Sequence, residues 1–317
     1  MYNDWLMITA GLGLASLLPV LLRLRRGVRA TALTHTWGAT CLVWFVWMTV
    51  TNFSLPIWSY RSWGLWGNCL WYLAAVTALI PPIAALGARR PINRAWNAFV
   101  LVPLLLVFAW PVMPAVWRGA GNPAAFDLET PMVLGFALVS IMGAGNYVGL
   151  SHSGSALLWL AGLWMIVLPL CPGMASWFKD PAVYRPWAVW CLVAAGWIAD
   201  RQVARRRHST DHAVLSLDRV WNDFRELFGM VWARRIMDRI NEDARRQRAT
   251  LYLGWHGLET ATGEKPAEPL DPAAYAAAEQ GLRWLLQKFV DPEWIDRRML
   301  PPEATSLSEA AQKSSAK

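Results

Sequence analysis

The stretch TPMVLGFALVSIMGAGNYVGLSHSGSALLWLAGLWMIVLPLCPGMASWF, residues 130–178, contains no Asp, Glu, Lys or Arg. A helix needs about 20 apolar residues to cross the hydrocarbon core of a bilayer, so this run is long enough for two crossings. Backbone N–H and C=O groups inside lipid must bond to each other, which favours helices. Three more uncharged stretches precede it, and they lie between Arg29 and Arg61, between Arg61 and Arg89, and between Arg94 and Arg118.

The composition of the whole chain agrees with this pattern. Of its 317 residues, 55% are hydrophobic and 16% are charged, whereas soluble domains carry about 25% charged residues. The sequence therefore predicts an all-α polytopic membrane protein with about seven transmembrane helices and a small helical cytoplasmic region at its C-terminus. The expected spans are residues 5–22, 33–50, 69–87, 96–116, 131–150, 156–174 and 186–199.

Arginines indicate the side on which each loop lies. The segments RLRRGVR (23–29) and RQVARRR (201–207) each contain four arginines, and ARRPINR (88–94) contains three. The loops expected on the other side carry fewer basic residues, namely Arg61, Arg118, Lys179 and Arg185. Loops rich in Arg and Lys stay in the cytoplasm. This predicts an integral protein of a bacterial inner (plasma) membrane, with its N-terminus outside and its C-terminus in the cytoplasm.

The chain changes character after the last expected span. Residues 1–200 are predicted to form the transmembrane domain, and residues 201–260 a juxtamembrane region built around an amphipathic helix. A linker at 261–272, a second helix at 273–300 and a disordered tail at 301–317 complete the predicted organisation. In the amphipathic helix, apolar residues recur at spacings of three and four. This apolar face is predicted to dock a protein partner through Trp221, Phe224, Phe228 and Trp232.

The segment WSYRSWGLWGNCLWYL (58–73) is unusually rich in tryptophan. Indole rings prefer the headgroup level of a bilayer, so one interpretation is an aromatic belt without a ligand. The other is a platform for a flat or lipid-like ligand, with the candidate residues Trp58, Trp63, Trp66, Trp71, His35, His152 and Asn146. Such outer loops are similar to those of cytochrome c assembly proteins that handle haem. The Trp-Asp signature and the outward-facing histidine pair of those proteins are absent, so the sequence assigns neither a family nor a cofactor.

Metal and thiol chemistry have weaker signals. His208 and His212 are four residues apart and would share a helix face, and with Asp211 they could hold a divalent cation. Alternatively, Ser209, Thr210 and Asp211 fit the N-cap of the following helix. The four cysteines lie in or beside apolar runs, where they would be small packing residues. A disulfide between Cys69 and Cys171 is the alternative.

Several functional classes are disfavoured. The expected spans contain no Asp, Glu, Lys or Arg, whereas pumps and proton-coupled carriers keep ionisable groups at depth. A retinal protein would need a lysine in its last span, and no Walker loop, GxGxxG, GxSxG or HExxH motif is present. The net charge of +8 is explained largely by the loop arginines, so no nucleic acid is expected as a partner.

Three functions remain open. The first is a non-catalytic scaffold or subunit in the lipid bilayer, whose cytoplasmic helix docks a protein partner. The second is a carrier or handler of an uncharged planar or lipid-like molecule of the haem, quinone or lipid class. The third is a membrane-bound enzyme with a histidine site at the cytoplasmic face, around His35, His152 and His208. The absence of catalytic motifs favours the scaffold.

Overall fold

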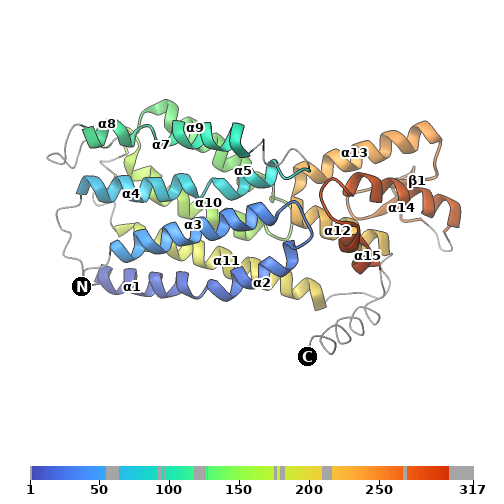
Figure 1. The fold of residues 1–317 in the computed structure, drawn as a ribbon, viewed down its shortest axis with the longest axis horizontal. Coiled ribbons are helices and arrows are strands. Elements are labelled where there is room, and N and C mark those ends of the chain that lie inside the picture. The colour runs from blue at the N-terminus through green and yellow to red at the C-terminus, as the bar shows by residue number, and fades with distance from the viewer. Residues whose placement is uncertain are drawn as a thin grey trace. The chain divides into compact units, whose positions relative to one another are not determined.

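The computed structural model describes residues 2–54, 64–90, 95, 97–117, 126, 128–174, 177–178, 183–208, 216–266 and 270–299. The described chain is mostly helical (Figure 1). It divides into two compact units. The first comprises Met1–Arg29, Leu33–Ala88 and Ile92–Val203, and the second comprises Ala30–Ala32, Arg89–Pro91 and Ala204–Lys317.

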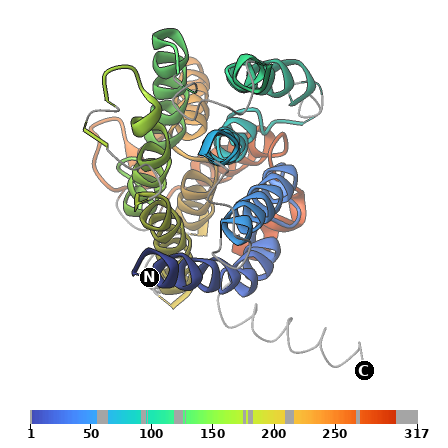
Figure 2. The ribbon, with the colours of Figure 1, turned by 90° about the vertical axis from the view of Figure 1, so that its left-hand side faces the viewer.

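The first unit is built from apolar helices that lie alongside one another and are seen end-on in Figure 2. Its elements are α1 (Tyr2–Ala15), α2 (Leu18–Val28), α3 (Thr34–Phe53), α4 (Gly64–Thr77), α5 (Ile80–Leu86), η2 (Asn97–Leu101), α7 (Val102–Ala109), α8 (Val112–Trp117), α9 (Thr130–Gly145), α10 (Ser153–Val167), η4 (Leu168–Leu170) and most of α11 (Arg185–His208). Each of the seven expected spans overlaps one or more of these helices.

Within the described residues, four helical segments are long and apolar enough to cross a membrane. They are Asp4–Val28, Leu65–Leu86, Phe99–Trp117 and Ser153–Leu170. A fifth apolar helix, α9, is shorter. The two remaining helices are α3, with 20 residues, and α11, with 24; Trp and Thr lower the hydropathy of the first, and the arginines after residue 200 lower that of the second.

Prolines divide two of these segments into shorter helices. Pro19 lies in the first turn of α2, directly after α1, and Pro81 and Pro82 lie in the first turn of α5, directly after α4. A proline has no N–H to donate to the preceding turn, which interrupts the helical hydrogen bonds. The carbonyls that this frees need donors from neighbouring helices or water.

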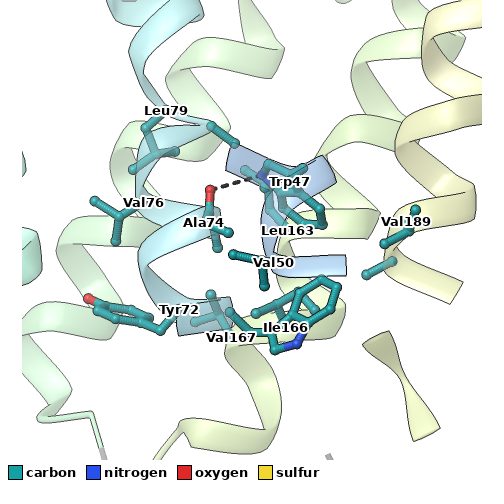
Figure 3. Close-up of a cluster of buried hydrophobic side chains, with 14 of the residues drawn as sticks. Trp47, Val50, Tyr72, Ala74, Val76, Leu79, Leu163, Ile166, Val167 and Val189 are labelled. Carbon is teal, nitrogen blue, oxygen red and sulfur yellow. Dashed lines mark hydrogen bonds between the residues drawn. The ribbon is translucent and has the colours of Figure 1, made fainter. Parts of the chain in front are cut away.

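Tryptophans of α3 bond to backbone carbonyls close to these two breaks. Trp44 Nε1 donates to the carbonyl oxygen of Leu14 at 2.8 Å, and Trp47 Nε1 donates to that of Ala74 at 3.0 Å. Leu14 precedes the α1–α2 break and Ala74 precedes the α4–α5 break. Figure 3 shows Trp47 and Ala74 among aliphatic side chains of α3, α4, α10 and α11. These indoles therefore join α3 to the helices on both sides of it.

Glycines allow close approach between the later helices. A Cβ at Gly162 of α10 would lie 2.9 Å from the Ala188 carbonyl oxygen on α11, and a Cβ at Gly143 of α9 would lie 2.9 Å from Pro82 Cβ. Real Cβ atoms do not approach that closely. These two positions thus set the α10–α11 and α9–α5 spacing.

The second unit contains α12 (Ser216–Phe228), α13 (Met230–Gln247), the antiparallel strands β1 (Leu251–Leu253) and β2 (Leu258–Thr260), α14 (Pro272–Leu286) and α15 (Pro292–Met299). Gly229, with a φ of 84°, separates α12 from α13. A positive φ is readily adopted by glycine but is costly for other residues, so the long amphipathic helix expected from the sequence is two helices.

Candidate functional site

A half-buried polar and aromatic cluster joins α3, α4 and α11. Trp71 Nε1 donates to Ser54 Oγ at 3.0 Å, and the Trp71 ring meets the Trp47 ring edge-on with centroids 5.7 Å apart. The Arg185 guanidinium donates to Asn68 Oδ1 at 2.5 Å and lies 5.8 Å from the Trp71 ring centroid. A stacked arginine held by an amide is a fixed positive group, and this α3–α4–α11 cluster was not predicted from the sequence.

The proposed tryptophan platform is not assembled as one surface among the described residues. Trp71 is 1% exposed and belongs to the core, whereas Trp66 is 41% exposed. Trp58 and Trp63 lie outside the described residues. Trp71 therefore lies inside the first unit, where its indole N–H bonds to Ser54 and its ring contacts Trp47, and ligand binding by these tryptophans stays a prediction.

Other tryptophans do present their rings at the surface of the first unit. Trp117 is 88% exposed, and the remaining members of this exposed group are Trp5, Trp110, Trp177 and Trp187. Exposed indoles near the ends of apolar helices are typical of aromatic belts. The described tryptophans of the first unit thus include some that pack helices together and others that face outward.

The predicted histidine site is not assembled either. His35 is exposed on α3, whereas His152 Nδ1 lies 3.1 Å from Gln202 Oε1 of α11. Asn146 is buried at the end of α9. No contact described by the structure joins His35 to His152.

The metal and disulfide predictions have different outcomes. The side chain of His208, together with Asp211 and His212, lies outside the described residues. Within the described part of the chain, no three His, Cys, Asp or Glu side chains could hold a metal ion together. Cys69 and Cys171 are both free and buried. The alternative of a Cys69–Cys171 disulfide is therefore wrong, and both thiols pack in the apolar core.

A half-buried ion pair between α2 and α11 was also missed. Arg23 Nη1 lies 2.8 Å from Asp200 Oδ2, whose side chain is 10% exposed. The same guanidinium lies 6.0 Å from the ring centroid of Trp197, and Trp197 Nε1 donates to Ser16 Oγ. Both charges lie just past the ends of the expected spans, so the sequence marked them as loop residues.

The four side chains expected to dock a partner form the core of the second unit. Phe289, which follows α14, has its ring centroid 5.4 Å from Phe224, 5.4 Å from Phe228 and 4.8 Å from Trp232. Trp221 is fully buried beside them. Their apolar stripe is thus covered by this chain itself, and a partner would meet other residues.

One face of α12 binds the backbone of the β1–β2 hairpin. Asp218 Oδ1 accepts from the Leu258 N–H at 2.7 Å, and the Arg225 guanidinium donates to the Trp255 carbonyl oxygen. Trp221 Nε1 donates to the same carbonyl at 3.3 Å. These α12 residues are three or four positions apart, so they share a face. The hairpin is therefore fixed by side chains as well as by its own strand pairing.

Asn241 of α13 holds the other strand. Its Oδ1 accepts from the Leu253 N–H at 2.8 Å, and its Nδ2 donates to the Leu253 carbonyl at 2.9 Å. A strand edge with unpaired backbone groups can pair with other chains. Asn241 closes the β1 edge at this residue. The exposed His256 at the hairpin tip is consequently presented on a rigid support.

Searches against known protein families, curated proteins and solved structures find no match to this chain. Function is therefore argued from the geometry above. That geometry assembles a packed helical unit and a second unit with its own aromatic core. Asp218 and Arg225 of α12 hold the hairpin.

Proposed function

We propose that this chain is a seven-span membrane scaffold that presents its second unit to a protein partner on the cytoplasmic side. The proposal rests on which segments of the chain make up the second unit. It includes Ala30–Ala32 and Arg89–Pro91, which come from two connections between apolar helices. Chain segments that pack within one unit outside the bilayer lie on the same side of it.

This condition supports an even number of crossings between residues 32 and 89. Among the residues that the structure describes there, one helix, Leu65–Leu86, meets the length and hydropathy expected of a span. The second crossing then falls to α3, whose 20 residues extend about 30 Å at a rise of ~1.5 Å per residue. That length matches the hydrocarbon core.

The same condition supports an even number of crossings between residues 91 and 204. The part of this interval that the structure describes contains four helical stretches, namely Phe99–Trp117, α9, Ser153–Leu170 and α11. These four, together with Asp4–Val28, α3 and Leu65–Leu86, make seven proposed spans. The Ala30–Ala32 and Arg89–Pro91 connections contain or adjoin the arginine clusters, and such loops stay in the cytoplasm. The proposed orientation therefore has the N-terminus outside.

Reporter fusions test this topology. Fusions to green fluorescent protein should fluoresce after Arg29, Arg90 and Arg205, and fusions to alkaline phosphatase should be active after Ser54 and Trp117. The opposite pattern at Ser54 would show that α3 does not cross, and with it the seven-span arrangement would fail. Matched pairs of both reporters at each position control for expression.

The scaffold role is supported by how polar groups are used. Asp218 and Arg225 are buried and bond to the hairpin, so they stabilise a defined surface. A preformed surface loses less conformational entropy on binding. We expect that truncation after residue 208 leaves membrane insertion intact and removes a protein partner from affinity purifications.

Recovery of the same partners by the full and truncated chains would exclude this role. A second variant guards against partners lost through misfolding. His256→Ala alters the exposed hairpin tip without touching the core, and it should weaken the same interaction. Asp238→Ala, on the exposed side of α13, serves as the matched control for a change elsewhere on the unit.

A further inference from the structure

The segment Lys288–Asp291, between α14 and α15, is held by backbone groups from two earlier parts of the chain. The Arg90 N–H donates to the Lys288 carbonyl at 2.9 Å, and the Ala32 N–H donates to the Phe289 carbonyl at 2.7 Å. On the other side, the Asp291 N–H donates to the Ala30 carbonyl at 2.8 Å. We refer to Ala30–Ala32 and Arg89–Arg90 as the loop strips.

Residues of one loop strip are paired in the manner of a β-sheet. Thr31 and Val290 form an antiparallel bridge, and both are buried, with exposures of 2% and 0%. Ala30 adopts a φ of 66°, which is unusual for a residue other than glycine. A costly backbone conformation persists where surrounding contacts hold it, so the pairing is specific.

The edge of the contact between Lys288–Asp291 and the loop strips is an ion pair that is partly exposed to solvent. The Arg90 guanidinium pairs with the Asp291 carboxylate, and their side chains are 42% and 39% exposed. Its inner side is apolar, because Phe289 also packs against the aromatic rings of α12 and α13. The contact therefore has a dry interior and a half-exposed charged edge.

We propose that Lys288–Asp291 is a latch that holds the two loop strips and the C-terminal helices together as one body, with the Arg90–Asp291 pair as its releasable edge. Exposed ion pairs contribute little and are screened by salt. The latch should therefore open locally, more often at high salt, while the aromatic core stays closed. This inference rests on the contacts just described and holds with or without a docked partner.

A buried cysteine measures the opening directly. The full chain, with its four native cysteines replaced by alanine, would carry Thr31→Cys, and the rate of alkylation by a hydrophilic maleimide would be followed in native membranes. Arg90→Ala should raise this rate about two- to five-fold, the factor that corresponds to a half-exposed ion pair. High salt should raise the rate in the parent protein and have no further effect in Arg90→Ala.

Four controls separate latch opening from unfolding. Ala233→Cys, fully buried in α13, should react at an unchanged slow rate in both backgrounds. Arg89→Ala should leave the Thr31→Cys rate unchanged, and the exchanged pair Arg90→Asp with Asp291→Arg should return it toward that of the parent. Thr31→Cys with Val290→Cys should form a disulfide under mild oxidation. Equal acceleration at Ala233→Cys, no response to Arg90→Ala, or no disulfide would each overturn the proposal.

Discussion

Trp47 of α3 donates its indole N–H to the carbonyl oxygen of Ala74 on α4 at 3.0 Å, and its ring is 1% exposed. This single residue combines a hydrogen bond to a helix backbone with an aromatic contact to Trp71. It explains why a tryptophan, rather than another large apolar residue, stands at the centre of the first unit.

Substitutions at Trp47 should separate packing from hydrogen bonding. Trp47→Phe keeps most of the apolar contact and loses the donor, which should cost about 0.5–1.5 kcal/mol. Trp47→Ala opens a cavity and should cost about 3–5 kcal/mol. Thermal unfolding of the protein in mild detergent measures both. Trp110→Phe, at an exposed position, is the control, and a loss equal to that of Trp47→Phe would contradict the assigned role.

Gly162 should tolerate no side chain. A Cβ there meets the Ala188 carbonyl at 2.9 Å, whereas a Cβ at Gly154 of the same helix meets nothing within 4 Å. Gly162→Val should force α10 and α11 apart at a cost of about 1–3 kcal/mol. Gly154→Ala should be neutral or stabilising because alanine favours the helix. Equal melting temperatures for the two variants would show that the helices separate without cost.

Removal of one partner from the Arg23–Asp200 pair should have unequal effects. The Asp200 side chain is 10% exposed and that of Arg23 is 52% exposed. Arg23→Ala leaves a buried carboxylate without its cation and should destabilise by about 1–3 kcal/mol. Asp200→Asn leaves a half-exposed guanidinium that water can solvate, so the loss should be smaller. Unfolding temperatures in detergent give the order, and the reverse order would contradict this reasoning.

Asp218 should make the stability of the second unit depend on pH. Burial raises the pKa of this carboxyl above its ordinary value of 3.8, and the hydrogen bond from Leu258 only partly opposes it. The folded state therefore keeps its proton at pH values where the unfolded chain has lost it. Stability from this group is complete below pH 3.8 and is lost as the pH rises through the raised pKa.

Two variants of Asp218 test the direction of this pH dependence. Asp218→Asn keeps an oxygen for the Leu258 N–H and removes the charge, so unfolding followed by circular dichroism should lose this part of the pH dependence. Asp218→Ala leaves the N–H without its acceptor and should cost about 1–3 kcal/mol across the whole range. A steeper pH dependence in Asp218→Asn would show that the carboxylate is stabilised by the fold.

Much of the prediction of helices rested on hydropathy and periodicity along the sequence. The uncharged run 130–178 contains α9 and α10, separated at Gly145 and Ser153, because backbone hydrogen bonding leaves few options to long apolar segments. The length of α11 was underestimated, since the arginines after residue 200 were interpreted as a loop and yet continue the helix. Arginine is a good helix former, and charge alone does not end a helix.

The predictions about individual sites were less successful, and Trp71 and Phe224 show why. Trp71 was grouped with its sequence neighbours as a surface residue, but α3 and α11 cover it. Phe224 was expected to contact a protein partner, but the ring of Phe289 from the same chain packs against it. In both cases the covering residue comes from a distant part of the chain. Periodicity reveals that a face is apolar but cannot say what packs on it.

By itself, the sequence determined a helical chain with membrane-length apolar segments and a charged amphipathic region at its end, because hydropathy and periodicity are properties of neighbouring residues. Only the tertiary structure decided which tryptophans are internal, how α12 holds the hairpin, and that Ala30–Ala32 and Arg90 pair with Lys288–Asp291. Those features depend on contacts between residues far apart in the chain, and burial and hydrogen bonding are set by such contacts.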